Sequence, residues 1–294
     1  EARIELARTY EMAKQDSLAR ITYEEAYLAD TTRIETIVEV LDYHIRNNNT
    51  SERFRFEERV FKNESIPLSV KLERLDELMS GELYRNNYFR VGALISSLVK
   101  HYPTERQFIR MYAAHLCNGG MVEEGINYLR GHLDDEGVEA EDYELIALLN
   151  SMLERHDLDD SDLRRGVQLF NTSITLWDMY SVARHLQGDT KGAITIMRKA
   201  LKHAVSSEDI SLCWGRIGDY YHELQNDAKA FKAYRSALDY NPENVEVLNN
   251  YAYYLAEHDT DLEKAEKMSK KAINADPNNA TFLDTYGWVL YKMG

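Results

Sequence analysis

The sequence predicts an all-α fold in which antiparallel helix pairs stack into a solenoid. Its 294 residues include only 4 Pro and 14 Gly. Leu, Ala, Glu, Lys and Arg are frequent between these breakers, so long helices are favoured. Pro242 and Pro277 lie 35 residues apart, and each closes a similar pair of helical patterns. A period of this length is typical of stacked helical repeats.

The composition favours a globular protein and excludes several classes of partner. The 35 basic and 50 acidic residues give a net charge of −15, which opposes the phosphate backbone of a nucleic acid. The longest apolar stretch, around 91–99, is too short to span a bilayer. Cys117 and Cys213 form no CxxC pair or Cys/His cluster, so neither a zinc site nor a disulfide framework is predicted. We expect no cofactor, no nucleic-acid partner and no membrane-spanning segment.

Residues 1–30 predict one helix pair, and residues 31–105 predict divergent pairs. The first segment reads Leu6-Ala7-x-x-Tyr10 and then Ala19-x-x-x-Tyr23-x-x-Ala26. Between 31 and 105 only a 3.6-residue spacing of apolar positions persists, which indicates amphipathic helices. These positions are Ile34, Ile37, Val38 and Leu41; Leu72, Leu75 and Leu78; and Val91, Leu94, Ile95 and Leu98.

Residues 106–173 predict weaker copies of the same pairs. The patterns are Ile109-x-x-Tyr112-Ala113-x-x-Leu116 and Ile146-x-x-Leu149-Asn150-x-x-Leu153. A helix containing Val167 and Phe170 is followed almost at once by the helix of Trp177. Because a full second helix does not fit there, we expect a break in regularity near 171–174. Either a shortened helix or a bend between two solenoid segments would explain it.

Residues 174–294 predict a regular array. Its units begin with Trp177-x-x-Tyr180-Ser181, Trp214-x-x-Ile217-Gly218-x-x-Tyr221, Leu248-x-x-Tyr251-Ala252-x-x-Leu255 and Leu283-x-x-Tyr286-Gly287-x-x-Leu290. The second halves read Ala193-x-x-x-Met197-x-x-Ala200, Ala230-x-x-x-Tyr234-x-x-Ala237 and Ala265-x-x-x-Ser269-x-x-Ala272. Small residues at these positions let two helices approach closely, at the short end of the usual 8–10 Å. The prolines then force the chain to turn.

These repeated positions resemble the tetratricopeptide repeat (TPR) family, most closely over 174–294. The resemblance implies a right-handed superhelix whose concave face is lined by the first helix of each pair. It also implies a non-catalytic scaffold that binds a protein or peptide. The sequences Asn250–Ala252 and Asp284–Trp288 look like those of bacterial envelope-associated repeat proteins. We therefore expect a bacterial protein, with a periplasmic or envelope location favoured over a cytoplasmic one.

The residues expected to line the groove follow from counting along each first helix. Positions three, seven and ten beyond the second residue of each first helix share one helical face. With two flanking residues, the predicted binding residues are Asp178, His185, Arg216, Asp219, His222, Asn249, Asn250, Tyr253, Asp284 and Trp288. Tyr and Trp provide rigid contact area, and such residues are enriched at binding hot spots.

Other chemistry finds little support in the sequence. No GxGxxG or HExxH pattern occurs, so neither a nucleotide site nor a paired-histidine metal site is predicted. The stretch 157–162 is similar to a calcium loop, but Asp162 replaces the required glycine and Gln168 the closing glutamate. The segment 130–166 holds 12 acidic and 4 basic residues. It is either a solvated turn region or a site for a basic partner.

We therefore expect a non-catalytic protein-binding or peptide-binding scaffold. The main alternative is a self-assembly module that pairs through open solenoid ends. A further alternative is an enzyme or a metal-dependent module hidden in 31–105. The last repeat is expected to be truncated, since the pattern from Leu283 stops at Gly294. A first helix without its second would leave apolar side chains exposed, so the chain would self-associate, swap its last helix or leave that helix frayed.

Overall fold

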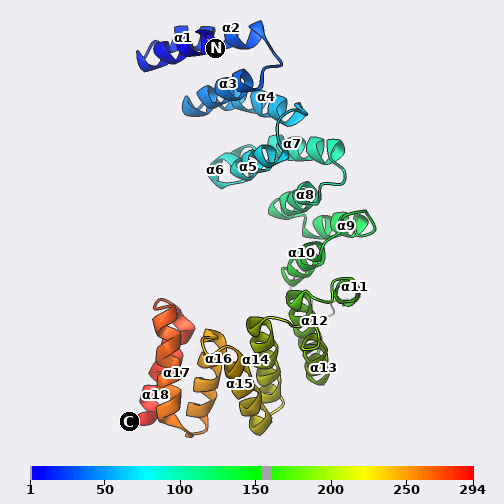
Figure 1. Cartoon of the computed structure of the whole chain (residues 1–294), viewed down its shortest axis with the longest axis vertical. Coiled ribbons are helices and arrows are strands. Elements are labelled where there is room, and N and C mark those ends of the chain that lie inside the picture. The colour runs from blue at the N-terminus through cyan, green and yellow to red at the C-terminus, as the bar shows by residue number, and fades with distance from the viewer. Residues whose placement is uncertain (1, 154–159) are drawn as a thin grey trace. The chain divides into compact units, whose positions relative to one another are not determined.

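The regular elements of the chain are helices (Figure 1). The computed structural model describes residues 2–153 and 160–294, and no strand occurs within these ranges. The chain divides into two compact units, Glu1–Val138 and Glu139–Gly294, called unit 1 and unit 2 here. The predicted all-α, solenoid-like fold is confirmed. None of the helices in the described ranges meets the length and apolarity that a bilayer span requires.

Unit 1 contains three regular helix pairs and a less regular middle. Its helices are α1 (Ala2–Met12), α2 (Asp16–Ala29), α3 (Ile34–Arg46), α4 (Thr50–Lys62), α5 (Leu68–Leu78), α6 (Gly81–Asn86), α7 (Tyr88–His101), α8 (Arg106–Asn118) and α9 (Val122–Gly131). The pairs α1/α2, α3/α4 and α8/α9 pack along their lengths, and α7 packs against α4, α6 and α8. Apolar positions predicted from the 3.6-residue spacing, such as Leu41, Leu75 and Ile95, are fully buried.

Unit 2 repeats one arrangement more regularly. Its helices are α10 (Ala140–Ser151), α11 (Ser161–Leu169), α12 (Ile174–Leu186), α13 (Thr190–Ala200), α14 (Ser207–Glu223), α15 (Asp227–Tyr240), α16 (Val245–Glu257), α17 (Leu262–Ala275) and α18 (Ala280–Met293). Helices α12/α13, α14/α15 and α16/α17 form antiparallel pairs, and α18 packs on both α16 and α17.

The small residues predicted to let paired helices approach closely lie at the helix contacts of unit 2. Ala230, Ala237, Ala265 and Ala272 are fully buried. Asparagine side chains start three of the helices by capping free backbone amides. Asn226, Asn244 and Asn279 accept hydrogen bonds from the backbone N–H groups of Lys229, Val247 and Phe282. Such caps satisfy donors that the first helical turn leaves without partners.

The irregularity expected near 171–174 comes from a short second helix. Helix α11 has only nine residues, ends at Leu169, and packs on both α10 and α12. It is therefore the second helix of the α10/α11 pair, which supports the shortened-helix interpretation. The division of the sequence at residues 30, 105 and 173 describes similarity between repeats and remains a prediction.

Candidate functional site

The first helices of unit 2 lie next to one another in a row. Helix α12 contacts α14, α14 contacts α16, and α16 contacts α18. All ten predicted binding residues lie on these four helices. We call the four helices the first-helix row. The fold therefore places the predicted residues on neighbouring elements, although they do not all have the same surroundings.

Five of the predicted residues form a polar network across three helices. Arg216 donates two hydrogen bonds to the Asp178 carboxylate, from Nε at 2.6 Å and from Nη2 at 2.8 Å. Asn250 Nδ2 donates to Asp219 Oδ1 at 3.1 Å, and Asn249 Nδ2 donates to Asn250 Oδ1 at 3.2 Å. Arg216 Nη1 lies 3.8 Å from Asp219 Oδ2, which joins the two halves. The paired geometry of Arg216 and Asp178 is the strong form of this interaction.

The Asp219 carboxylate is the centre of this network. It also accepts a hydrogen bond from the Tyr234 hydroxyl at 2.8 Å. Burial raises the pKa of Asp219, while the hydrogen bonds from Tyr234 and Asn250 act in the opposite direction. Burial and the neighbouring carboxylate raise the pKa of Tyr234. Because the partners of its oxygens lie on α14, α15 and α16, Asp219 primarily links α14 to these two neighbouring helices.

Asn249 lies in the core instead of on the accessible groove surface. Only 3% of the residue is exposed, and its Oδ1 has no hydrogen-bond partner in the part of the chain that the structure describes. Helix α16 has neighbours on two sides, α14 and α18. This leaves a narrower accessible strip than a helical wheel suggests. Asn249 therefore orients Asn250 and does not meet a ligand directly.

The two predicted histidines join helices within their own repeats. His185 Nδ1 lies 3.0 Å from Thr190 Oγ1, at the start of α13. His222 Nδ1 lies 3.0 Å from Asp227 Oδ1, at the start of α15, and its ring stacks on Tyr254 with centroids 3.6 Å apart. Each histidine thus closes the turn between a first and a second helix.

The remaining three predicted residues converge on one hollow. Tyr253, Asp284 and Trp288 line a space of about 480 Å³ between α16 and α18. The other lining residues are Glu257, Leu283, Gly287 and Tyr291. We call this space the aromatic hollow. The rings of Trp288 and Tyr291 stack with centroids 5.5 Å apart, so one wall is a continuous aromatic surface.

Some polar groups of the aromatic hollow have no ion-pair or hydrogen-bond partner among the described residues. Neither Glu257 nor Asp284 lies within ion-pairing distance of a cation among the described residues, and both are exposed. The indole nitrogen of Trp288 is buried and has no hydrogen-bond partner there. Lys292 Nζ lies 5.3 Å from the centroid of the Trp288 ring. The hollow can therefore contact apolar groups through its rings and cationic or hydrogen-bonding groups through its carboxylates.

Sequence reasoning missed Glu257 and named Leu283 only as a packing residue. Glu257 follows Tyr253 by four residues, which is about one helical turn. That spacing could have identified it. The contribution of Leu283 depends on how α18 packs against α16, which no spacing within one helix reveals.

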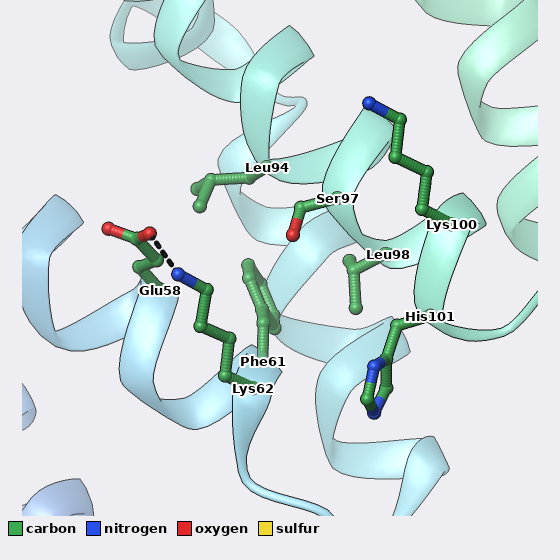
Figure 2. Close-up of a pocket in the computed structure, with 8 residues that line it drawn as sticks. All are labelled: Glu58, Phe61, Lys62, Leu94, Ser97, Leu98, Lys100 and His101. Carbon is green, nitrogen blue, oxygen red and sulfur yellow. Dashed lines mark hydrogen bonds and ion pairs between the residues drawn. The ribbon is translucent and has the colours of Figure 1, made fainter.

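A different hollow in unit 1 contains charges of both signs. Figure 2 shows it between α4 and α7, with a volume of about 400 Å³. Lys62 Nζ donates to Glu58 Oε1 at 2.6 Å, so this cation is already neutralised. The side chains of Phe61 and Leu98, which lie to the right of this pair in the picture, are largely buried. None of the predicted binding residues lines this hollow.

No group of three or more His, Cys, Asp or Glu residues suited to a metal ion occurs in the described ranges. The calcium-like stretch 157–162 lies partly outside those ranges. Cys117 and Cys213 are free thiols, and burial raises the pKa of Cys213 to about 12. A thiol with so high a pKa is a weak nucleophile at neutral pH.

Comparison with known proteins identifies the repeat. The tetratricopeptide repeat family model matches residues 212–244, which cover most of α14 and all of α15. A TPR repeat-containing protein of Pseudomonas aeruginosa is 32% identical over 88 residues. That match covers 30% of this chain and 15% of the relative, so the relative is much longer than the similar region.

Two solved structures share the fold at low sequence identity. The crystal structure of the APC/C hetero-tetramer Cut9–Hcn1 aligns with a TM-score of 0.50 and 14% identity, covering 94% of this chain and 60% of that one. The C-terminal part of a TPR repeat-containing protein from Cytophaga hutchinsonii aligns with a TM-score of 0.55 and 14% identity, covering 83% and 97%. These similarities concern the fold alone.

Proposed function

We propose that this chain is a tetratricopeptide-repeat scaffold that binds a protein or peptide partner on the first-helix row of unit 2. The aromatic hollow carries the proposal, because it joins a stacked Trp288–Tyr291 wall to two carboxylates that have no ion-pair partner among the described residues. Aromatic side chains with a polar rim are typical of protein interfaces. TPR repeats generally serve protein interaction, and the proposal assigns no catalytic step to the chain.

The polar network of Asp178, Arg216, Asp219 and Asn250 supports this function indirectly. It fixes α12, α14 and α16 relative to one another within unit 2, so the ligand meets a surface that is already ordered. Such preorganisation lowers the entropy cost of binding. The net charge of −15 supports a protein partner over a nucleic acid. A location in a bacterial envelope stays a prediction.

Peptide display with matched variants tests the proposal. A random peptide library is selected on the parent chain, and the enriched peptides are then measured against Tyr253→Ala/Trp288→Ala. A matched control is Tyr240→Ala, which removes a half-exposed tyrosine on α15. We expect the double variant to weaken binding at least tenfold and the control to change it less than threefold. Equal binding to all three proteins would show that the aromatic hollow is not the site.

Self-assembly is the second candidate, and the surface of α18 favours it. Leu283, Leu290 and Tyr291 are 48%, 43% and 74% exposed. Exposed contiguous apolar side chains tend to associate. Sedimentation velocity over a hundredfold concentration range should then show a dimer that Leu290→Glu dissociates. A parent that remains monomeric over the whole range would exclude this candidate.

A further inference from the structure

A third hollow, which lies in unit 2, is lined by cations and by none of the predicted binding residues. It lies between α13, the end of α14 and the start of α15, and its volume is about 710 Å³. The lining residues are Lys191, Ile194, Thr195, Arg198, Tyr221, Leu224, Asn226 and Lys229. We call it the cationic hollow. It shares no residue with the aromatic hollow.

The three cations of this hollow lack carboxylate partners. Lys191, Arg198 and Lys229 are exposed, and none lies within 4.0 Å of a carboxylate oxygen in the described ranges. The chain carries 50 acidic side chains against 35 basic ones, so partners are abundant elsewhere. Helix α13 contains no acidic residue. The hollow is therefore a local positive surface on an acidic protein.

Two of the cations are held in place by one tyrosine. Arg198 Nη2 donates a hydrogen bond to the Tyr221 hydroxyl at 2.9 Å. Lys229 Nζ lies 5.3 Å from the centroid of the same ring, a distance at which a cation is attracted to the aromatic face. Tyr221 thus gathers two like charges whose mutual repulsion an anionic ligand would relieve. The arrangement favours anion binding before any ligand arrives.

The spacing of the cations suits a chain of separated charges. Lys191 and Arg198 are seven residues apart on α13, which corresponds to about 10 Å along a helix. The backbone positions of the two cations are thus farther apart than one phosphate group is wide. In a polyproline II segment, residues three apart share one side and lie about 9 Å apart. Carboxylates at every third position of such a segment would match the two cations.

We propose that the cationic hollow binds an acidic peptide segment of a partner protein. Two of its carboxylates pair with Lys191 and with Arg198, and Lys229 adds the third positive charge. The partly exposed Leu224 gives the segment an apolar contact beside Tyr221. This site goes beyond the proposed function, because its residues and its charge preference differ from those of the aromatic hollow.

Fluorescence anisotropy with a defined probe tests the site. The probe is a fluorescein-labelled peptide of four Glu-Pro-Ala triplets, measured on the full chain in buffer of about 20 mM salt. The variant is Lys191→Gln/Arg198→Gln/Lys229→Gln. The control, Lys202→Gln/Lys232→Gln/Lys267→Gln, removes three other exposed cations of unit 2 and changes the net charge equally. Circular dichroism checks that both variants keep the parent's helix content.

We expect the first triple variant to lose at least tenfold in affinity and the control to lose less than threefold. A Gln-Pro-Ala version of the probe should bind at least tenfold more weakly than the acidic probe. Arg198→Lys, which keeps the charge but loses the guanidinium geometry at Tyr221, should give an intermediate loss. If the triple variant fails to fold, the affinity of Arg198→Lys for the probe tests the site instead.

Three results would overturn the proposal. Equal losses in the two triple variants would mean that net charge, and not this hollow, attracts the probe. Equal binding of the Gln-Pro-Ala peptide would exclude carboxylate recognition. Tripolyphosphate that binds the parent more tightly than the peptide, and loses that affinity in the first triple variant, would make the hollow a phosphate site instead.

Discussion

Glu57 is a carboxylate in the core of unit 1, where a charge is costly. It is fully buried, and its Oε1 lies 3.6 Å from Arg53 Nε and 3.8 Å from Arg74 Nη1. These distances are too long for hydrogen bonds. Arg74 also pairs with Asp42 at 3.1 Å. Burial raises the pKa of Glu57 from 4.5 to about 7, against the opposing effect of the two arginines.

This raised pKa predicts a pH-dependent stability. The unfolded chain ionises Glu57 near pH 4.5, whereas the folded chain keeps it protonated until about pH 7. The free energy of unfolding should therefore fall as pH rises between these values. Glu57→Gln has no carboxyl group that titrates at this position. The free energy of unfolding of the variant minus that of the parent should therefore increase by about 2 kcal/mol between pH 5 and pH 8. Urea unfolding at both pH values measures it.

The neighbouring exposed glutamate provides the control for Glu57. Glu58→Gln removes an ion pair with Lys62 at the surface, and such pairs contribute little. Its stability relative to the parent should change by less than about 0.5 kcal/mol between pH 5 and pH 8. If Glu57→Gln tracks the parent at both pH values, then Glu57 is ionised in the folded protein and the arginines outweigh the effect of burial.

The sequence predicts which helix face a side chain occupies but not what packs against that face. Tyr253, Asp284 and Trp288 converge as their spacing suggests. Asn249 has the same spacing and is buried. His222 is bound to Asp227 of the next helix. The difference arises from neighbouring helices, whose position a 3.6-residue period within one helix does not encode.

The close contact between α14 and α15 depends on Gly218 of α14. A Cβ added at Gly218 would lie 2.5 Å from Cε1 and 2.6 Å from Cδ1 of Tyr234. Tyr234 is fully buried and bonded to Asp219, so its ring has little freedom to move. Gly218→Ala should therefore lose about 1–3 kcal/mol through overpacking, although alanine favours a helix by about 1 kcal/mol.

The equivalent glycine of α18 gives a matched comparison. A Cβ at Gly287 would meet no atom of the described residues within 4 Å. Gly287→Ala should thus keep only the helix-propensity gain, up to about 1 kcal/mol. Thermal unfolding followed by circular dichroism should give a lower Tm for Gly218→Ala than for the parent. The Tm of Gly287→Ala should equal or exceed that of the parent. Equal shifts in the two variants would refute the assigned α14/α15 contact.

The elements that the sequence predicted best are those with a repeated motif. Helices α12–α18 follow the recurring aromatic, glycine and alanine positions of 174–294. Between 31 and 105 the apolar spacing indicated helices but not their pairing. The short helix α6 gave no periodic signal, because six residues make fewer than two turns. Gly81 starts it with a φ of +64°, a local feature that periodicity does not report.

The boundary between the two units falls at Val138 and Glu139. The sequence offered no prediction there, since neither a linker composition nor a proline marks it. Gly137 lies just before it with a φ of +80°. Each unit has a core of its own. In unit 1 it extends from Ala7 to Phe108, and in unit 2 a cluster extends from Ala230 to Val289.

Both proposed binding sites consist wholly of residues from unit 2. The aromatic hollow is built by α16 and α18, and the cationic hollow by α13, α14 and α15. In repeat proteins the stabilising contacts are mainly between neighbouring repeats. A fragment of residues 139–294 should therefore retain the core and both sites without unit 1.

The 139–294 fragment tests whether unit 2 alone folds and binds both peptides. The 139–294 fragment should show a helical circular dichroism spectrum and one cooperative thermal transition. It should bind the peptides selected on the parent, and the Glu-Pro-Ala probe, within about threefold of the full chain, because a threefold change corresponds to about 0.7 kcal/mol. A helical fragment that has lost both affinities would assign binding to unit 1. A fragment without a cooperative transition would show that the core of unit 2 does not suffice for folding.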